Sequence, residues 1–158
     1  MKENELLKII RHIALATVNE DGAPHNTPLF FAIDEEIKNL YFASKESSLH
    51  SRNFVRTGEG FAVLYDSNIF KGGIYLTLKN CRKATDKELP AALDVYTKRL
   101  VGCDNDALPP NFHEIEDGYR LYVGEIAKIE VYHAKEDANG HVKNEERREV
   151  TAEELLNE

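Results

Sequence analysis

Residues 13–33 read IALATVNEDGAPHNTPLFFAI, and this stretch decides which fold the rest of the chain completes. Two strand patterns, 13–18 and 25–33, flank the turn sequence 19–22, in which Gly22 can supply the positive φ that a tight hairpin turn needs. The stretch therefore predicts a β-hairpin. Because Pro28 has no N–H for a sheet ladder, we expect it at a bulge or where the ladder is open.

Outside this hairpin the sequence alternates between strand and helix patterns. Apolar alternation predicts strands over 40–44, 61–66, 74–84 and 119–132, with a short edge strand over 147–150. Apolar spacing and capping residues predict helices over 2–11, 47–56 and 85–100, with a capping box at Thr151 and Glu154 for a last short helix. Strands outnumber helices and follow one another mainly through hairpins. This order favours a mainly β (α+β) fold, an antiparallel barrel or sheet with flanking helices.

Composition and charge limit the class of protein. The 158 residues, 42% of them hydrophobic and 30% charged, predict a single folded domain over 1–158. Lys and Arg number 20 against 28 Asp and Glu, and the net charge of −8 disfavours nucleic acid and anionic membranes as partners. No apolar run approaches the ~18 residues of a membrane span. The N-terminal residues lack the pattern of a signal peptide, so we expect a cytoplasmic protein.

Common catalytic and metal-binding motifs are absent from the sequence. It contains no GxGxxG, GxxxxGK[ST] or GxSxG pattern. The six histidines are scattered, and neither HExxH nor CxxC brings potential ligands together. We therefore expect no metal site, and no catalytic residue can be named.

Residues 44–53, SKESSLHSRN, form the most informative polar segment. They follow a predicted strand and open a predicted helix, whose first N–H groups and dipole favour an anion. Hydroxyl donors come from Ser44, Ser47 and Ser48, and positive charge from His50 or Arg52. The pattern predicts a phosphate site; the alternative is that Ser47 only caps the helix and the others are solvated.

Five pieces of the sequence together resemble the pyridoxamine 5′-phosphate oxidase-like family of flavin-binding split barrels. They lie in the family's order and spacing within about residues 5–78, and 119–131 and 147–150 match the last strands more loosely. The pieces are LATVNEDGAP at 15–24, TPLFF at 27–31, LYFAS at 40–44, the turn with Ser47, His50 and Asn53, and YDS at 65–67 with GIYL at 73–76.

The resemblance implies a six-stranded antiparallel split β-barrel that forms a homodimer, with FMN in a groove at the dimer interface. The flavin ring would lie on residues 27–30, and the phosphate would meet the serine-rich turn, with His50 or Arg52 as its basic residue. The cofactor-binding residues implied in this way are Thr27, Pro28, Leu29, Phe30, Phe42, Ala43, Ser44, Ser47, Ser48, His50 and Arg52.

The function implied is an FMN-dependent oxidoreductase acting on a small molecule that the sequence does not identify. Authentic pyridoxamine phosphate oxidases carry basic residues where this chain has Thr27, Ala32, Ser48 and Leu49. This difference leaves open a non-enzymatic flavin or haem binding module, or a cofactor-free split-barrel dimer. Dimer formation has independent support, because strands such as 61–65 are apolar on both faces and need cover on each.

Overall fold

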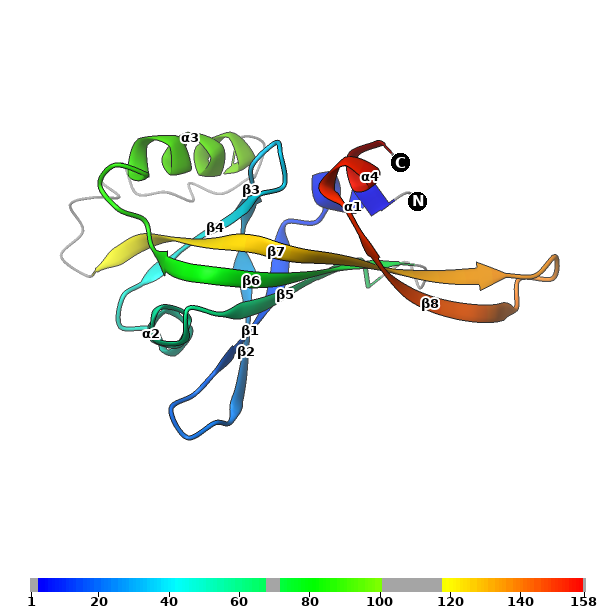
Figure 1. The fold of residues 1–158 in the computed structure, drawn as a ribbon, viewed down its shortest axis with the longest axis horizontal. Coiled ribbons are helices and arrows are strands. Elements are labelled where there is room, and N and C mark those ends of the chain that lie inside the picture. The colour runs from blue at the N-terminus through cyan, green and yellow to red at the C-terminus, as the bar shows by residue number, and fades with distance from the viewer. Residues whose placement is uncertain (1–2, 68–71, 101–117, 158) are drawn as a thin grey trace.

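The computed structural model describes residues 3–67, 72–100 and 118–157, which form a curled antiparallel sheet of eight strands with four helices around it (Figure 1). The strands are β1 (His12–Val18), β2 (Pro24–Phe30), β3 (Ala32–Ile33), β4 (Asn39–Lys45), β5 (Gly60–Tyr65), β6 (Gly73–Lys83), β7 (Tyr119–Glu136) and β8 (Val142–Val150). The helices are α1 (Glu3–Ile9), α2 (Leu49–Thr57), α3 (Leu89–Leu100) and α4 (Ala152–Asn157). The predicted fold class is confirmed, with eight strands in place of the six expected.

The segment 24–33 closes the curl of the sheet. The strand order β2-β1-β5-β6-β7-β4-β3 puts β2 and β3, which follow each other in sequence, at opposite ends. Phe31 separates them and is buried in the core, so the predicted single strand over 25–33 is two strands. Pro28 pairs with Ala14 of β1 on a strand at the end of the order. The expectation that Pro28 lies where the ladder is open is therefore confirmed.

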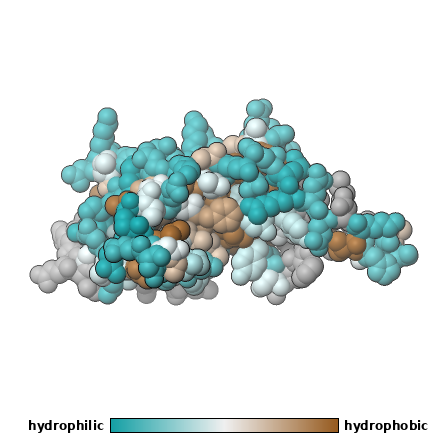
Figure 2. Space-filling view, turned by 60° about the horizontal axis from the view of Figure 1, so that its bottom comes forward, coloured by the Kyte–Doolittle hydropathy of each residue, from teal (hydrophilic) through white to brown (hydrophobic). Residues whose placement is uncertain are grey.

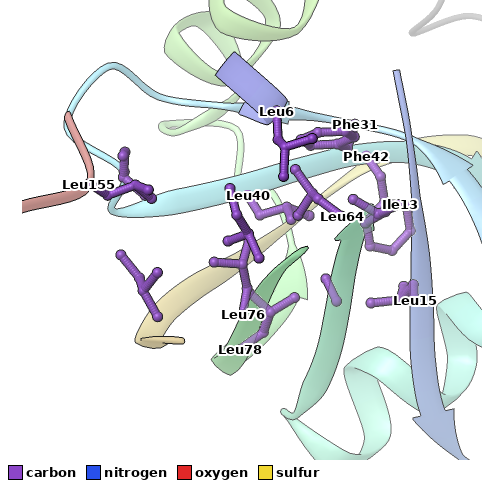
Figure 3. Packing of buried hydrophobic residues seen from close by; sticks show 14 of the residues in the cluster. Leu6, Ile13, Leu15, Phe31, Leu40, Phe42, Leu64, Leu76, Leu78 and Leu155 are labelled. Atoms are coloured by element: carbon purple, nitrogen blue, oxygen red, sulfur yellow. The ribbon is translucent and has the colours of Figure 1, made fainter. Parts of the chain in front are cut away.

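Two hydrophobic clusters hold the sheet together. The larger one fills the inside of the curl, where side chains from the sheet meet Leu6 of α1 and Leu155 of α4 (Figure 3). Phe54 of α2 belongs to the same cluster. The smaller one lies between α3 and the outer side of β3, β4 and β7, and its buried members are Ala32, Ala92, Tyr96 and Leu121. Helix α3 therefore covers one part of the outer surface of the sheet.

The long strand β7 joins the two halves of the molecule. On one edge β7 pairs with β6. On its other edge the first residues pair with β4 and the last residues pair with β8. The β7–β8 hairpin extends beyond the body of the molecule (Figure 1). The pairing of β7 with β6 shifts register near Gly124, where Asn80 and Cys81 of β6 bulge and Asn80 has a φ of 48°.

Helix boundaries follow local capping signals. Helix α2 ends at Gly58, whose φ of 67° is the left-handed conformation that glycine adopts readily. Before α3, Thr85 and Glu88 form a capping box, and the helix begins at Leu89 rather than at the predicted Thr85. Hydrogen bonds from Arg82 and from the Thr85 N–H lower the pKa of Glu88 to about 2. The predicted capping box of Thr151 with Glu154 at α4 is confirmed.

Asn53 links α2 to the first hairpin. Its side chain is 2% exposed and donates hydrogen bonds to Thr17 Oγ1 at 3.3 Å and Asn19 Oδ1 at 2.8 Å. We expect Asn53→Ala to lower the free energy of unfolding by about 1–2 kcal/mol. The buried Thr17 hydroxyl and the half-buried Asn19 amide oxygen would each lose the N–H that donates to them. Urea unfolding measures the change. Asn26→Ala, which removes an exposed amide from β2, is the control, and an equal effect of the two variants would contradict a role for the buried network.

Candidate functional site

The candidate site lies where β4 ends and α2 begins. Ser44, 7% exposed, is on the inner side of β4, and its Oγ lies 2.7 Å from His50 Nε2 and 3.3 Å from Ser48 Oγ. Ser48 precedes the first turn of α2 and makes no side-chain capping hydrogen bond. These three residues, which we call the Ser44 cluster, therefore place two hydroxyl groups and one imidazole beside a helix N-terminus.

His50 is neutral at neutral pH. Its ring stacks against His25 of β2, with ring centroids 6.4 Å apart and an interplanar angle of 1°, and it also contacts Phe42. Burial, and then the charge of His25, lower the pKa of His50 below its ordinary value of 6.5. With one donor and one acceptor nitrogen, the imidazole can therefore form a hydrogen bond with Ser44 and another with a ligand. It carries little positive charge at pH 7.

The four residues predicted to contact the flavin ring divide between the two faces of β2. Thr27 and Leu29 share the inner, half-buried face with His25. Pro28 is exposed on the outer face, where it lines a groove of about 310 Å³ with Tyr65 and Asp66. Phe30, on the same outer face, packs edge-on against Tyr96 of α3 at 5.5 Å between ring centroids.

The remaining predicted residues also separate. Phe42 is fully buried and stacks on Tyr122 at 5.1 Å, so it supports the site from the core. Ala43 packs against the smaller hydrophobic cluster, which lies between α3 and the sheet. Ser47 and Arg52 are exposed. Of the predicted phosphate ligands, the structure brings together Ser44, Ser48 and His50.

Two residues near the Ser44 cluster were missed by the sequence interpretation. His25 reaches His50 from β2, and Arg120 of β7 is the cross-strand partner of Ser44. Both are far from residues 44–53 in sequence, and strand alternation alone does not reveal which strand lies beside β4. Only a known sheet order could have identified them.

Among the described residues no helix is long and apolar enough to cross a membrane. In the same part of the chain, no three His, Cys, Asp or Glu side chains lie close enough together to hold a metal ion.

The structure was then compared with known proteins. Neither models of known families nor curated proteins gave a match to the chain, whereas 108 chains of solved structures match it. One is a pyridoxinephosphate oxidase family protein from Clostridium acetobutylicum, related to general stress protein 26 of B. subtilis. It is 14% identical with a TM-score of 0.65, over 96% of this chain and 93% of that one.

Two further matches differ in what their names say they bind. A heme binding protein from Mycobacterium smegmatis is 12% identical, with a TM-score of 0.66 over 99% of this chain. An F420 reductase is 18% identical, with a TM-score of 0.59 over 80% of this chain and 94% of that one. The chain spans 53% and 61% of the length of two matched proteins, the second being the heme binding protein. At these identities the likeness concerns the fold, and this chain has the split-barrel fold of the pyridoxamine 5′-phosphate oxidase-like proteins.

Proposed function

We propose that the protein binds FMN between two copies of the chain and acts as a flavin-dependent oxidoreductase on a small molecule. The observation that carries the proposal is the Ser44 cluster, where hydroxyl groups and an imidazole converge at the start of α2. Such a set suits a terminal phosphate, because hydroxyls and the free N–H groups of a first helical turn donate to its oxygens. Neighbours named as an F420 reductase and a pyridoxinephosphate oxidase family protein support the redox assignment.

When bound, FMN supplies the electron and hydride chemistry, and the chain supplies binding and orientation. Ser44 and Ser48 would hold the phosphate, and His50 would hold the Ser44 hydroxyl in place. Thr27 and Leu29 lie on the same side of the curl as His25, from which they can approach the rest of the cofactor. None of these residues needs to act as an acid or base.

We expect FMN to bind at least tenfold more tightly than riboflavin. A charge-assisted hydrogen bond to an ionised group contributes about 1.5–3 kcal/mol, and riboflavin has no phosphate to accept it. Titration followed by quenching of flavin fluorescence measures both affinities. Ser44→Ala should weaken the binding of FMN and leave the binding of riboflavin unchanged. Thr97→Ala, which removes an exposed hydroxyl from α3, is the control and should change neither affinity. Equal affinities for the two flavins would exclude the phosphate site.

Haem binding is the second candidate function. The heme binding protein from M. smegmatis has the same fold over 99% of this chain. His25 and His50, which lie with their rings parallel, could offer imidazole nitrogens to a haem iron. The visible spectrum of the protein mixed with haem or with FMN separates the candidates, because an iron–imidazole bond shifts the haem absorption band and leaves the flavin spectrum unchanged.

The proposed dimer would bury the outer face of β1, β5 and β6. Register pairs place Ala14 opposite Val63, Ala16 opposite Phe61, and Val63 opposite Tyr75, and these half-buried side chains belong to neither core cluster. Figure 2, a view turned from that of Figure 1, shows hydrophobic atoms among hydrophilic ones near the centre of the surface in view. Arg147 of β8 lies over the Tyr75 ring, 4.0 Å from its centre, and covers part of this face. An apolar face that its own chain covers only in part favours a second subunit, and a two-fold dimer covers both copies at once.

We expect a mass of two chains at low micromolar concentration. Obligate interfaces bury roughly 2,000 Å² or more, and a dimer with such an interface stays associated when dilute. Val63→Glu should give single chains, since it places a carboxylate in the middle of the proposed interface. Val55→Glu, on the exposed side of α2, is the matched control and should stay dimeric. Light scattering measures the masses, and a single-chain mass for the unmodified protein would refute the dimer.

A further inference from the structure

We propose that Arg120 carries the positive charge of the phosphate site, and that Glu46 competes with the bound phosphate for it. The inference rests on the proposed FMN function and identifies the basic residue, which is neither of the two that the sequence suggested.

The register of the sheet places Arg120 beside Ser44. The two residues lie directly opposite each other on β7 and β4, and opposite residues of an antiparallel pair project from the same face. The neighbouring pair confirms which face this is, because Phe42 and Tyr122 stack at 5.1 Å inside the curl. Cβ atoms of opposite residues lie about 4.5–5.5 Å apart, so a long guanidinium side chain can reach a ligand on the Ser44 hydroxyl.

The start of β7 also lies against the turn that carries Ser48. The Glu46 N–H donates to the Gly118 carbonyl at 2.8 Å, which holds the two segments together. The Arg120 side chain is 39% exposed; its Nη1 donates to the Tyr119 carbonyl at 2.8 Å, and its Nε lies 3.7 Å from Glu46 Oε2. The guanidinium is thus partly exposed, and it makes one carbonyl hydrogen bond and one longer contact with a carboxylate.

Glu46 is shared between two cations. Its Oε1 accepts from Lys83 Nζ at 3.1 Å, while its Oε2 faces Arg120. Glu46 thus has two cationic partners, and Asp86 lines the same groove as Lys83 and Arg120. Because a guanidinium can bind two phosphate oxygens at once, a phosphate monoester competes well against a long, exposed carboxylate contact.

Other basic residues near the turn are less suitable. Burial lowers the pKa of His50, which therefore lacks a charge at neutral pH. Arg52 is exposed between the buried residues Ser51 and Asn53, so it projects from the opposite side of α2. Lys45 follows Ser44 in β4 and therefore projects from the other face, with its Nζ 5.7 Å from the centre of the Tyr119 ring.

The test measures FMN and riboflavin affinities of charge variants by fluorescence quenching. Arg120→Gln should weaken FMN binding at least tenfold and change riboflavin binding less than twofold, and Arg120→Lys should restore part of the loss. Glu46→Gln should tighten FMN binding two- to tenfold, because it removes both the competitor and a nearby negative charge. Lys98→Gln, an exposed charge on α3, is the matched control.

The outcomes separate this inference from the proposed function. If the unmodified protein binds neither flavin, both fail. If it prefers FMN and Arg120→Gln keeps that preference, FMN binding stands and the role of Arg120 is refuted. Equal weakening of both flavins by Arg120→Gln would also refute it, since the residue would then act on the ring or on folding. Should Arg120→Gln fail to fold, Glu46→Gln decides: unchanged or weaker FMN binding overturns the inference.

Discussion

Phe54→Ala is expected to lower the free energy of unfolding by about 3–5 kcal/mol, because the variant empties a large, fully enclosed site. Phe54 is 0% exposed and lies where α2 meets the inside of the sheet. Its ring makes T-shaped contacts with Phe42 at 5.0 Å and with Tyr122 at 6.4 Å. The cavity would be lined by rigid aromatic rings, which cannot move far enough to fill it.

Urea unfolding followed by circular dichroism measures this loss. Val55→Ala, one residue further along α2 and 48% exposed, is the matched control, and we expect its effect to stay below about 0.5 kcal/mol. Similar losses for the two variants would mean that α2 is not held by its buried face. FMN binding should fall together with stability in Phe54→Ala, because α2 carries Ser48 and His50 of the Ser44 cluster.

Gly124→Ala is expected to cost about 1–3 kcal/mol, through overpacking rather than through a cavity. An added Cβ would lie 3.0 Å from Phe54 Cζ, 3.2 Å from Cys81 Sγ and 3.3 Å from Leu78 Cβ. All three atoms belong to the core, so none can move aside cheaply. Gly72→Ala is the control, since its Cβ would meet nothing closer than 3.8 Å.

A double variant tests the cause of the Gly124→Ala effect. In the Phe54→Ala background the closest of the three atoms is gone, so adding the methyl group at Gly124 should cost clearly less than in the unmodified protein. Such coupling is expected for residues in contact. Fully additive losses would show that Phe54 does not cause the effect, and would assign it to Cys81 and Leu78.

Local features of the fold could be predicted from the sequence, because their causes lie within a few residues. The turn at Gly22 and the capping box at Thr151 each depend on backbone conformation or on hydrogen bonds between near neighbours. Likewise, Pro28 requires an open ladder wherever its strand is placed. The mainly antiparallel class followed from the hairpins that these signals define.

The candidate site could be predicted only in part. Residues 44–53 contain a phosphate-binding pattern, and helical geometry turns positions 50 and 52 about 200° apart, so one of the two basic residues had to face away. Which one faces the cluster depended on the side of α2 that packs against the core, and the structure places His50 beside Ser44. Burial of that residue then lowers its pKa, a consequence that the sequence does not contain.

The sequence by itself determined most of the elements, the first hairpin turn and the polar segment at 44–53. Tertiary structure decided which elements meet. It divided the strand over 25–33 at Phe31, because the two halves pair at opposite ends of a curled sheet. It also set Arg120 opposite Ser44, although 76 positions separate them in the chain. Cross-strand partners depend on the register of the whole sheet, which the burial of many side chains sets together and which no short stretch of sequence encodes.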